Sequence, residues 1–382
     1  MKKLIYVANA RIPTEKAHGI QIMKMCESIG ELKVGNEKLE VELIVPRRLN
    51  PIKQNPFDYY VVRRSFKITK LPTLDFISFG LGQFGFFAET LIFLTASRIY
   101  LLFKNYDILY TREWLAGIFF KDVALEIHSL PARPNFLHKK TWRKAKVIFV
   151  LTSFLKNELI RIGVSENKIL VLPDAVDLAK FDIKIFKEDA RKKLNLPQSK
   201  KIILYTGSFY LYDWKGMDIL LEAAKNFGEE FLFLFVGGSE AEILNFKSQT
   251  INLNNLKLIG HKPYTEIPYY LKSADVLVLP NKAGHKMSEQ HTSPLKLFEY
   301  MASGRPIVAS DLPSLREVLT EKEALFFKPN DAEDLTRAIK KVLENASFAE
   351  ELSQNALKKV QNYTWQNRAH HAIDFISKKT YN

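Results

Sequence analysis

Residues Ser293–Asp311 read SPLKLFEYMASGRPIVASD and join a helical pattern to a short apolar run. Ser293 is a good N-cap residue, Pro294 suits the first helical position, and Gly304 suits the position just after a helix. The β-branched run Ile307–Ser310 then predicts a buried strand. The stretch therefore predicts a helix followed by a strand, which is a repeating unit of α/β folds.

Short apolar runs alternate with helical patterns along the rest of the chain as well. The other predicted strands are Leu4–Ala8, Val41–Pro46, Ile108–Thr111, Val123–His128, Val147–Leu151, Ile169–Leu172, Ile202–Thr206, Phe231–Val236, Leu256–Ile259 and Val276–Pro280. The helical patterns between them include Gly19–Ile29, Ser153–Ile162, Gly216–Asn226 and Ile267–Ser273. Strands that are apolar throughout and alternate with helices are typical of parallel sheets covered on both faces.

The length of the chain predicts its domains. With 382 residues, 47% apolar and 26% charged, the chain is long enough for two. We expect Rossmann-like domains over 1–180 and 195–362, a polar linker over 173–201, and a last helix near 364–382 that packs back on the first domain. Because open parallel sheets bind ligands at the carboxyl ends of their strands, two facing domains predict an interdomain cleft lined by the loops after those strands.

Composition narrows the class of protein. A single cysteine, Cys26, excludes a disulfide framework and is typical of a reducing compartment. The net charge of +14 favours anionic partners, which include nucleic acid, acidic lipid headgroups and phosphorylated small molecules. The amino terminus imitates a signal peptide, but its apolar core, Leu4–Val7, is too short for export, so we expect a cytoplasmic protein.

The helix predicted after Ser293 carries a lysine where the helix dipole disfavours one. Lys296 lies in the first turn, which contains no acid. Because the amino end of a helix already behaves as a partial positive charge, free N–H groups plus an ammonium predict a phosphate site. Glu299 lies three residues further on the same face, where a carboxylate can accept hydrogen bonds from ribose hydroxyls. The alternative is an ordinary surface ion pair between Lys296 and Glu299.

Extended to Leu319, the stretch reads SPLKLFEYMASGRPIVASDLPSLREVL and resembles the carboxyl-terminal signature of retaining glycosyltransferases of the GT-B fold, family 4. The resemblance covers most of residues 1–345 and is weakest from 50 to 104. It implies an acceptor domain followed by a donor domain. It also implies transfer of a sugar from a nucleoside-diphosphate sugar to a glycan or lipid-linked acceptor, with retention of anomeric configuration.

The stretch KIILYTGSFYLYDWKG, residues 201–216, matches the diphosphate loop of this family. An arginine after the glycine and a lysine before the second glycine usually neutralise the leaving group there. Lys215 matches the lysine after Gly207, whereas Ser208 replaces the arginine and shifts its duty to Lys296. From the residues alone, Lys215 is equally an ordinary solvated lysine before a helix.

The family also implies roles for three further positions. It favours an acid eight residues before the ribose-binding glutamate, where this chain has His291. In place of that acid, N–H groups and an ammonium come from the turn of Thr292, Ser293, Pro294, Leu295 and Lys296. The alternative for His291 is a plain loop histidine. The family places a histidine at the end of a first-domain strand beside the transferred sugar, which is His128 here. It also places a glycine, Gly19, close to the donor phosphates.

Three other patterns predict different functions. Gly80–Gly85 satisfies G-x-G-x-x-G, a weak sign of a nicotinamide-dependent oxidoreductase or an epimerase. The basic run Lys139–Lys146 suits solvent, an anionic membrane or nucleic acid, of which we expect the first two. Phe76–Ser97 is nearly long enough to span a bilayer, but Glu89 near its centre favours a core or interfacial segment. A non-catalytic basic membrane or nucleic-acid binder is thus a third class.

Metal chemistry has little support in the sequence, because neither H-E-x-x-H, nor C-x-x-C, nor D-x-D occurs. We therefore predict a glycosyltransferase that needs no cofactor and no metal, with His128, Lys215 and Glu299 as catalytic residues. The predicted partners are a nucleotide-sugar donor, a glycan or lipid-linked acceptor and an anionic membrane surface, without nucleic acid. We expect the protein in the cytoplasm, peripheral at the inner face of the membrane.

Overall fold

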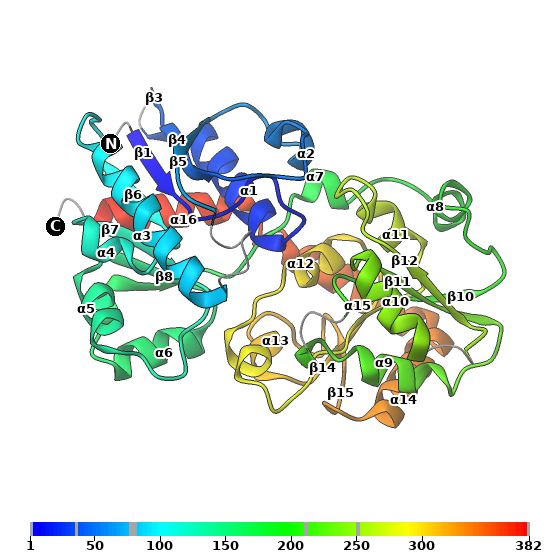
Figure 1. The fold of residues 1–382 in the computed structure, drawn as a ribbon. Helices are drawn as coiled ribbons and strands as arrows, with labels where there is room; N and C mark the ends of the chain where they lie inside the picture. Colours follow the sequence, from blue (N-terminus) through cyan, green and yellow to red (C-terminus); the bar gives the residue numbers. More distant parts are fainter. Residues whose placement is uncertain (1–2, 35–36, 76–81, 210–212, 250–252, 380–382) are drawn as a thin grey trace. The chain divides into compact units, whose positions relative to one another are not determined.

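A computed structural model describes residues 3–34, 37–75, 82–209, 213–249 and 253–379 of the chain. It divides into two compact units (Figure 1). The first comprises Met1–Pro173 and Trp365–Asn382, and the second comprises Asp174–Thr364.

The first unit is built on a parallel sheet of seven strands in the order β5-β4-β1-β6-β7-β8-β9. In that order the strands are Lys67–Pro72, Glu40–Arg47, Lys3–Val7, Ile108–Thr111, Val123–Ile127, Val147–Val150 and Ile169–Val171. A short antiparallel pair, β2 (Lys33–Val34) and β3 (Glu37–Lys38), lies outside this sheet. The strand order runs outward from β1 in both directions, which is the doubly wound arrangement.

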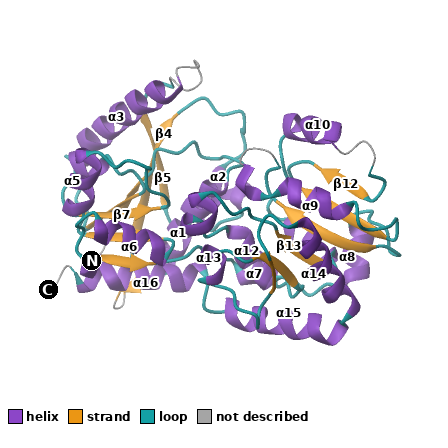
Figure 2. Ribbon diagram, turned by 90° about the horizontal axis from the view of Figure 1, so that it is seen from below, coloured by secondary structure: helices purple, strands orange, loops and turns teal. Residues whose placement is uncertain are grey.

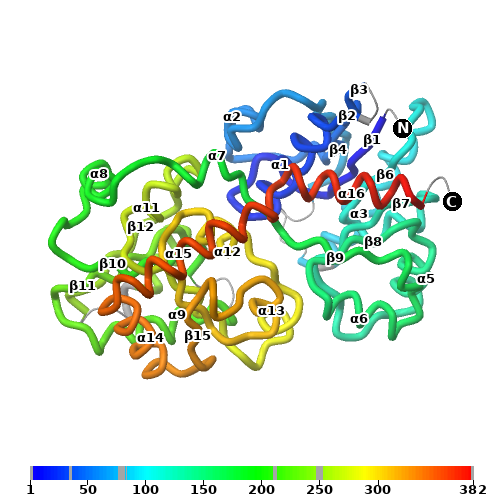
Figure 3. Tube along the Cα trace, turned by 180° about the vertical axis from the view of Figure 1, so that it is seen from behind, coloured from blue at the N-terminus to red at the C-terminus, as the bar shows by residue number. Residues whose placement is uncertain are grey.

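Helices cover both faces of this sheet because its strands are apolar on both sides. One face packs against α1 (Ala17–Glu31), α2 (Pro56–Tyr60) and α16 (Trp365–Lys378). The other packs against α3 (Gly82–Leu101), α4 (Ala116–Phe119), α5 (Phe136–Lys144) and α6 (Ser153–Arg161). Figure 3 shows the last helix, α16, lying beside α1 although the two are far apart in the sequence.

The second unit repeats this layering on a parallel sheet of six strands in the order β12-β11-β10-β13-β14-β15 (Figure 2). In that order the strands are Leu256–Ile259, Phe231–Val236, Lys201–Thr206, Val276–Leu279, Ile307–Ser310 and Leu325–Phe327. One face is covered mainly by α7 (Leu178–Phe181), α11 (Ile267–Ser273), α12 (Leu295–Ala302) and α13 (Pro313–Arg316). The other packs against α9 (Met217–Ala224), α10 (Glu240–Gln249) and α14 (Ala332–Glu344), while α15 (Ala346–Val360) contributes to both clusters.

Residues 174–200, which the sequence predicts largely as a linker, pack with the second unit. Val176 forms a parallel bridge with Thr364, and Phe181 is fully buried in the core. The helix α8 (Lys187–Lys193) is anchored by the Arg191 guanidinium, which donates to the Asp275 carboxylate over 2.6 Å. The first unit therefore ends earlier than the predicted residue 180, because these contacts bind the segment to the second sheet.

The long apolar helix α3 packs on the first sheet. Its residues Phe84–Leu101 are long and apolar enough to cross a membrane by length and composition, and 39% of that window is buried inside the protein. Phe93 and Leu94 are fully buried, and the buried Glu89 carboxylate pairs with Arg48. These contacts show that one side of α3 belongs to the core.

The G-x-G-x-x-G pattern lies in a poor setting for a dinucleotide site. Gly80 and Leu81 are outside the described residues. The preceding strand, β5, ends at Pro72, whereas α3 begins only at Gly82. A dinucleotide fingerprint needs its glycines in the tight turn between strand and helix, so this setting does not support a nicotinamide site.

Candidate functional site

In the second unit, the ends of β10 and β11 leave room for the side chain of Lys296. Gly207 follows β10 with a φ of +131°, and a Cβ atom placed there would lie 2.7 Å from Lys296 Nζ. Gly237 follows β11 with a φ of +128°, and a Cβ there would lie 2.3 Å from the Gly207 carbonyl oxygen. Only glycine suits these two positions, because both have a positive φ and a Cβ atom would be too close to its neighbours. The lack of a side chain at Gly207 leaves room for Lys296 at the carboxyl edge of the sheet.

The half-buried Lys296 ammonium lies against an aromatic ring. Its Nζ lies 3.7 Å from the centre of the Tyr205 ring, in a cation–π contact. Within the described part of the chain it forms no ion pair. Burial, and next the neighbouring charge of Lys215, hold the pKa of Lys296 well below its usual range, although Glu299 opposes the shift. The charged form of Lys296 is therefore disfavoured in the free protein, and an anion bound beside it would favour that form again.

Lys215 lies close enough to Lys296 for the two ammonium groups to repel one another. It ends the 3₁₀ turn η2 (Asp213–Lys215), and its Nζ donates to the Ser208 hydroxyl. Burial lowers the pKa of Lys215 to about 8, although the charge of Glu242 opposes the shift. Gly216 follows with a φ of +72°, and a Cβ there would lie 1.7 Å from the Pro280 carbonyl oxygen. The reading of Lys215 as a solvated lysine is therefore wrong.

Glu299 is a buried carboxylate on α12, one turn beyond Lys296. Burial raises its pKa to about 7, while the Tyr264 hydroxyl that hydrogen-bonds to it and the Lys296 charge act in the opposite direction. Its exposed fraction is 7%. The two residues do not form the surface ion pair that the sequence left open. Glu299 is thus partly protonated near neutral pH.

The start of α12 differs in detail from the prediction. Pro294, rather than Ser293, occupies the N-cap position, no side chain caps the helix, and Leu295 is its first residue. The Ser293 hydroxyl instead accepts a hydrogen bond of 3.1 Å from the backbone N–H of Asp174. The first turn contains no acid. The amino end of α12 therefore adds a partial positive charge beside the two lysines.

His291 is not a plain loop residue. It ends a π-helical turn, η3 (Met287–His291), and only 2% of it is exposed.

Gly304 has a φ of +66° and follows the C-cap residue Ser303, as the sequence predicts. The structure thus brings Gly207, Ser208, Lys215, Lys296 and Glu299 to one place. It puts Ser293 and His291 in packed positions near the start of the same helix.

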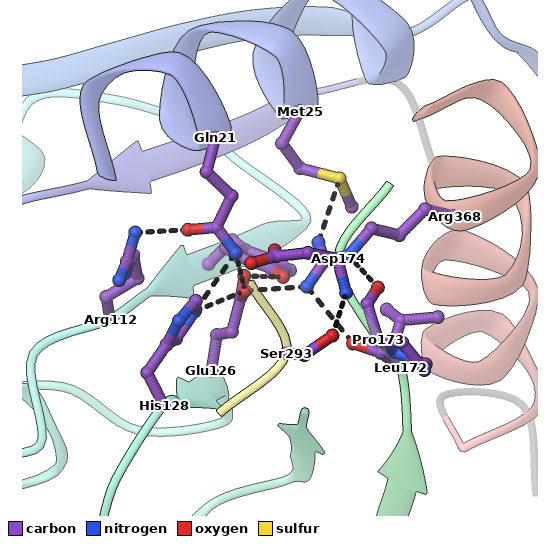
Figure 4. A network of polar contacts seen from close by, with 11 residues as sticks. Gln21, Met25, Arg112, Glu126, His128, Leu172, Pro173, Asp174, Ser293 and Arg368 are labelled. Atoms are coloured by element: carbon purple, nitrogen blue, oxygen red, sulfur yellow. Dashed lines mark hydrogen bonds and ion pairs between the residues drawn. The ribbon is translucent and has the colours of Figure 1, made fainter. Parts of the chain in front are cut away.

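In the first unit a polar network surrounds the carboxylate of Glu126 (Figure 4). Glu126 lies on the apolar strand β7 and is 2% exposed. It accepts hydrogen bonds from the Tyr110 hydroxyl, the Gln21 amide, His128 Nε2 and the Arg368 guanidinium, the last three over 2.6, 2.7 and 2.7 Å. Burial opposes the charge, but Arg368 and then His128 hold the pKa of Glu126 well below its usual range. The carboxylate is therefore ionised and fully balanced.

The network also sets the protonation of His128, which follows β7. His128 Nε2 lies 2.7 Å from the Glu126 carboxylate, which only accepts, and 3.0 Å from the Gln21 amide nitrogen, which only donates. The shorter contact with the ionised carboxylate favours the proton on Nε2, which leaves Nδ1 as an acceptor. Burial, and next the charge of Arg112, lower the pKa of His128 to about 4. His128 is thus a neutral imidazole of fixed tautomer at physiological pH.

Gly19 is closely packed against Tyr60 and Thr14. A Cβ there would lie 2.1 Å from the Tyr60 hydroxyl and 2.7 Å from the Thr14 methyl carbon Cγ2. The Gly19 N–H donates to the carbonyl of Lys16 over 2.9 Å. The glycine therefore makes room for Tyr60, and its closeness to the donor phosphates stays a prediction.

The sequence did not predict several residues of the Glu126 network or of the cluster around Lys296. Glu126 had one signal, a lone carboxylate within the apolar strand VALEI. Gln21, Arg112 and Arg368 had none, because their partners are remote in the sequence. In the second unit Gly237 follows a predicted strand, and Tyr264 gave no pattern. Within the described ranges, no group of three or more His, Cys, Asp or Glu side chains could hold a metal ion.

Comparisons with known proteins relate the chain to sugar-transferring enzymes. Residues 186–359 match the family described as glycosyl transferases group 1. Over 256 residues the chain is 27% identical to an N,N'-diacetylbacillosaminyl-diphospho-undecaprenol alpha-1,3-N-acetylgalactosaminyltransferase from Campylobacter jejuni. That match covers 65% of this chain and 64% of the relative, so the chain spans slightly less than two thirds of its length.

Two solved structures show the same fold over almost the whole chain. Sucrose-phosphate synthase from Thermosynechococcus elongatus has a TM-score of 0.78 at 21% identity, with 100% of this chain and 99% of that chain covered. Anabaena HepE, in complex with UDP and glucose, has a TM-score of 0.76 at 14% identity, with 99% and 100% covered. At such identities the likeness concerns the fold.

Proposed function

We propose that the chain, which has the GT-B fold and matches the glycosyl transferases group 1 family over residues 186–359, moves a sugar from a nucleoside-diphosphate sugar to a glycan or lipid-linked acceptor. The proposed transfer retains anomeric configuration and needs neither a cofactor nor a divalent cation. One observation carries the proposal, namely the pair of half-buried lysine side chains, Lys215 and Lys296, beside the end of β10.

The pair suits a departing nucleoside diphosphate. Removal from water disfavours the charged form of each lysine, and the pKa values of both are lowered. A diphosphate supplies negative charge that favours the charged form, and that negative charge grows as the bond to the sugar breaks. Donors that are already in place for a developing charge commonly contribute about 3 kcal/mol each to the transition state. Lys215 and Lys296 therefore act as catalytic cations in this proposal, assisted by Ser208 and the amino end of α12.

Glu299 and His128 have separate proposed roles. Glu299 accepts hydrogen bonds from the ribose hydroxyls, and its pKa of about 7 falls when such donors are present. His128, neutral and held by Glu126, accepts a hydrogen bond at Nδ1 from the transferred sugar as its anomeric carbon becomes oxocarbenium-like. Arg368, Gln21 and Tyr110 position Glu126 and act through it.

An anionic membrane surface is the second proposed partner. The helices α3, α4 and α5 cover one face of the first sheet and contact one another in that order. Phe84, Phe103 and Phe136 on or beside them are 89%, 82% and 72% exposed. The exposed Lys139 and Lys140 lie on α5 with Phe136, and Lys140 Nζ is 5.8 Å from the centre of the Phe136 ring. Aromatic and basic side chains together are typical of enzymes that lie on lipid.

The first experiment asks whether the chain binds a nucleoside diphosphate. UDP, GDP and ADP are screened by thermal shift with the purified protein. A ligand at one hundred times its Kd stabilises the protein by about 2.7 kcal/mol, so one of them is expected to raise the melting temperature. The same protein is then mixed with NADH, whose fluorescence should not change. A response to NADH without a response to any diphosphate contradicts the proposal.

A flotation assay tests the membrane surface. We expect the protein to bind vesicles of phosphatidylcholine and phosphatidylglycerol, and not vesicles of phosphatidylcholine alone. The double variant Phe84→Ser, Phe103→Ser should lose this binding, whereas the control Leu244→Ser, at a position of the second unit that is 68% exposed, should keep it. Equal flotation of both variants would remove α3 from the membrane surface.

A further inference from the structure

A cavity of about 370 Å³ in the first unit lies beside His128. Its lining comes from the residues after β6 and β7 and from α5, and it includes Arg112, Trp114, His128, His138 and Trp142. The loops after parallel strands are where such sheets bind ligands, and this volume lies within the range of small-molecule sites. The cavity is therefore placed and sized for a ligand.

Aromatic side chains form one part of the lining. The rings of Trp114 and His138 are stacked, with centres 3.8 Å apart and planes 18° apart, and His138 also contacts Trp142. Flat aromatic faces bury apolar C–H surface at a low cost in conformational entropy. A sugar ring presents such C–H groups on one face and hydroxyl groups at its edge, so this part of the lining suits a sugar.

The polar groups of the lining have hydrogen-bonding capacity to spare. The buried indole Nε1 of Trp142 has no acceptor among the described residues. The Asn135 Oδ1 atom accepts from the backbone N–H of His138, so the 2.6 Å contact of Oδ1 with Nδ1 makes Nδ1 a donor. His138 Nε2 is then an acceptor, and burial lowers the pKa of this imidazole. The cavity thus offers the His138 Nε2 atom as an acceptor to a hydroxyl group, whereas the Trp142 indole N–H is enclosed by the protein.

The charge at the cavity is positive. Arg112 donates to the Gln21 side-chain oxygen but forms no ion pair with a carboxylate in the described part of the chain. The carboxylate that also lines the cavity, Glu126, is already balanced by Arg368. Arg112 acts at short range, since it contributes to the low pKa values of both His18 and His128. An arginine in this state favours an anion, and its planar fork matches phosphate.

We propose that this cavity binds the acceptor, and that the acceptor is a sugar carrying a phosphate group. Trp114 and His138 contact the sugar ring, His138 Nε2 accepts from one of its hydroxyl groups, and Arg112 binds the phosphate. This inference rests on the proposed function and goes beyond it by naming the acceptor class. The phosphate belongs either to a soluble sugar phosphate or to the link between a sugar and a lipid, and α5 carries both cavity residues and exposed basic residues.

The test measures binding of sugar 1-phosphates to the full-length protein by calorimetry, with UDP, GDP or ADP present at saturation. The panel comprises the 1-phosphates of glucose, galactose, mannose and N-acetylglucosamine, each beside its methyl glycoside. We expect at least one phosphate to bind about tenfold more tightly than its glycoside. Decyl phosphate esters of the same sugars in detergent form a second arm. Tighter binding of the ester indicates a lipid-linked acceptor, and equal binding a soluble one.

Variants separate the two kinds of contact. Arg112→Gln should remove the preference for phosphate and leave the affinity for the glycoside, while Arg112→Lys should keep part of the preference. Trp114→Ala should weaken the phosphate and the glycoside equally, and Trp114→Phe should restore most of both. Arg161→Gln, which removes an exposed arginine from α6, is the matched control and should change neither.

The outcomes distinguish the inference from the proposed function. If a nucleoside diphosphate binds and no sugar phosphate does, the cavity is not a phosphosugar site, although the proposed function stands. If sugar phosphates bind equally to Arg112→Gln, Trp114→Ala and the unaltered protein, the assigned residues are wrong. If no nucleoside diphosphate binds at all, the proposed function itself fails.

Discussion

The two units treat buried charge in opposite ways. In the first unit the Glu126 carboxylate accepts hydrogen bonds from the Arg368 guanidinium and from three further side chains. In the second unit the ammonium groups of Lys215 and Lys296 lie near one another, and both have lowered pKa values. A balanced cluster holds a structure in place, whereas an unbalanced one gains most when a ligand of opposite charge arrives.

The difference has an energetic basis. Burying a charge costs several kcal/mol unless partners compensate for it, and in the first unit they do. In the second unit Glu299 is the nearby acid on α12, and its own pKa of about 7 leaves it partly protonated near neutral pH. The surroundings of Lys215 and Lys296 therefore disfavour their charged forms, which is expected of a binding site.

Loss of Arg368 should have the largest effect on stability. Arg368→Met leaves the Glu126 carboxylate buried without its ion-pair partner, which typically costs about 3–5 kcal/mol. Urea unfolding followed by circular dichroism measures this loss. The matched variant Lys296→Met removes an uncompensated charge and should leave the free energy of unfolding unchanged or higher. Equal destabilisation by the two variants would erase the contrast between the units.

Loss of Lys215 should have the largest effect on turnover among the donor-site residues. Lys215→Ala should lower the transfer rate by about two orders of magnitude, or roughly 2.7 kcal/mol, because the leaving diphosphate loses a cation. The melting temperature should not fall, because the half-buried charge is removed with its side chain. Steady-state kinetics with the donor found in the thermal-shift screen measure the rate. A rate equal to that of the unaltered protein excludes Lys215 from catalysis.

Glu299→Gln should have a smaller effect, confined to nucleotide binding. The amide still accepts one hydrogen bond but has no charge, so affinity for the nucleoside diphosphate should fall about tenfold, or roughly 1.4 kcal/mol. Calorimetry measures this affinity. As a control, Glu317→Gln changes a partly buried acid in a different helix and should have no effect. Unchanged affinity in Glu299→Gln would remove this residue from the ribose site.

Removal of divalent cations should have the smallest effect. If the two lysines supply the positive charge, EDTA should change the transfer rate by less than about twofold, which corresponds to roughly 0.4 kcal/mol. The rate is compared in EDTA, in magnesium and in manganese. Strict dependence on either ion would contradict the proposal that ammonium groups alone neutralise the leaving group.

The sequence predicts the fold and the donor half of the site well, for a local reason. Both stretches that carry the donor residues, 201–216 and 293–311, contain a strand, a helix signal and the lysine together. Apolar runs such as Phe231–Val236 match the observed strands directly. Strand β5 was missed because its residues KITKLP alternate with lysines at the sheet edge, and β15 because it has only three residues.

The network of the first unit could not be predicted in this way. Glu126 and Arg368 are 242 residues apart in the sequence, and only the packing of α16 against the first unit brings them together. The contact of Gly19 with Tyr60, 41 residues away, was likewise not predicted. Ser293 satisfies a capping pattern, but the backbone N–H of Asp174 binds its hydroxyl instead. Contacts between distant segments decide all three cases.

Proton uptake on binding of the nucleoside diphosphate tests the central claim most directly. The pKa of free Lys215 is about 8, and a bound diphosphate raises it, so at pH 8 the complex holds more protons than the free protein. Calorimetry in two buffers of different ionisation enthalpy should show an uptake of about half a proton or more, and affinity should fall as the pH rises above 8. The uptake should decrease in Lys215→Met. Binding without proton uptake, or affinity that is constant from pH 8 to pH 10, would contradict the claim that half-buried ammonium groups bind the diphosphate.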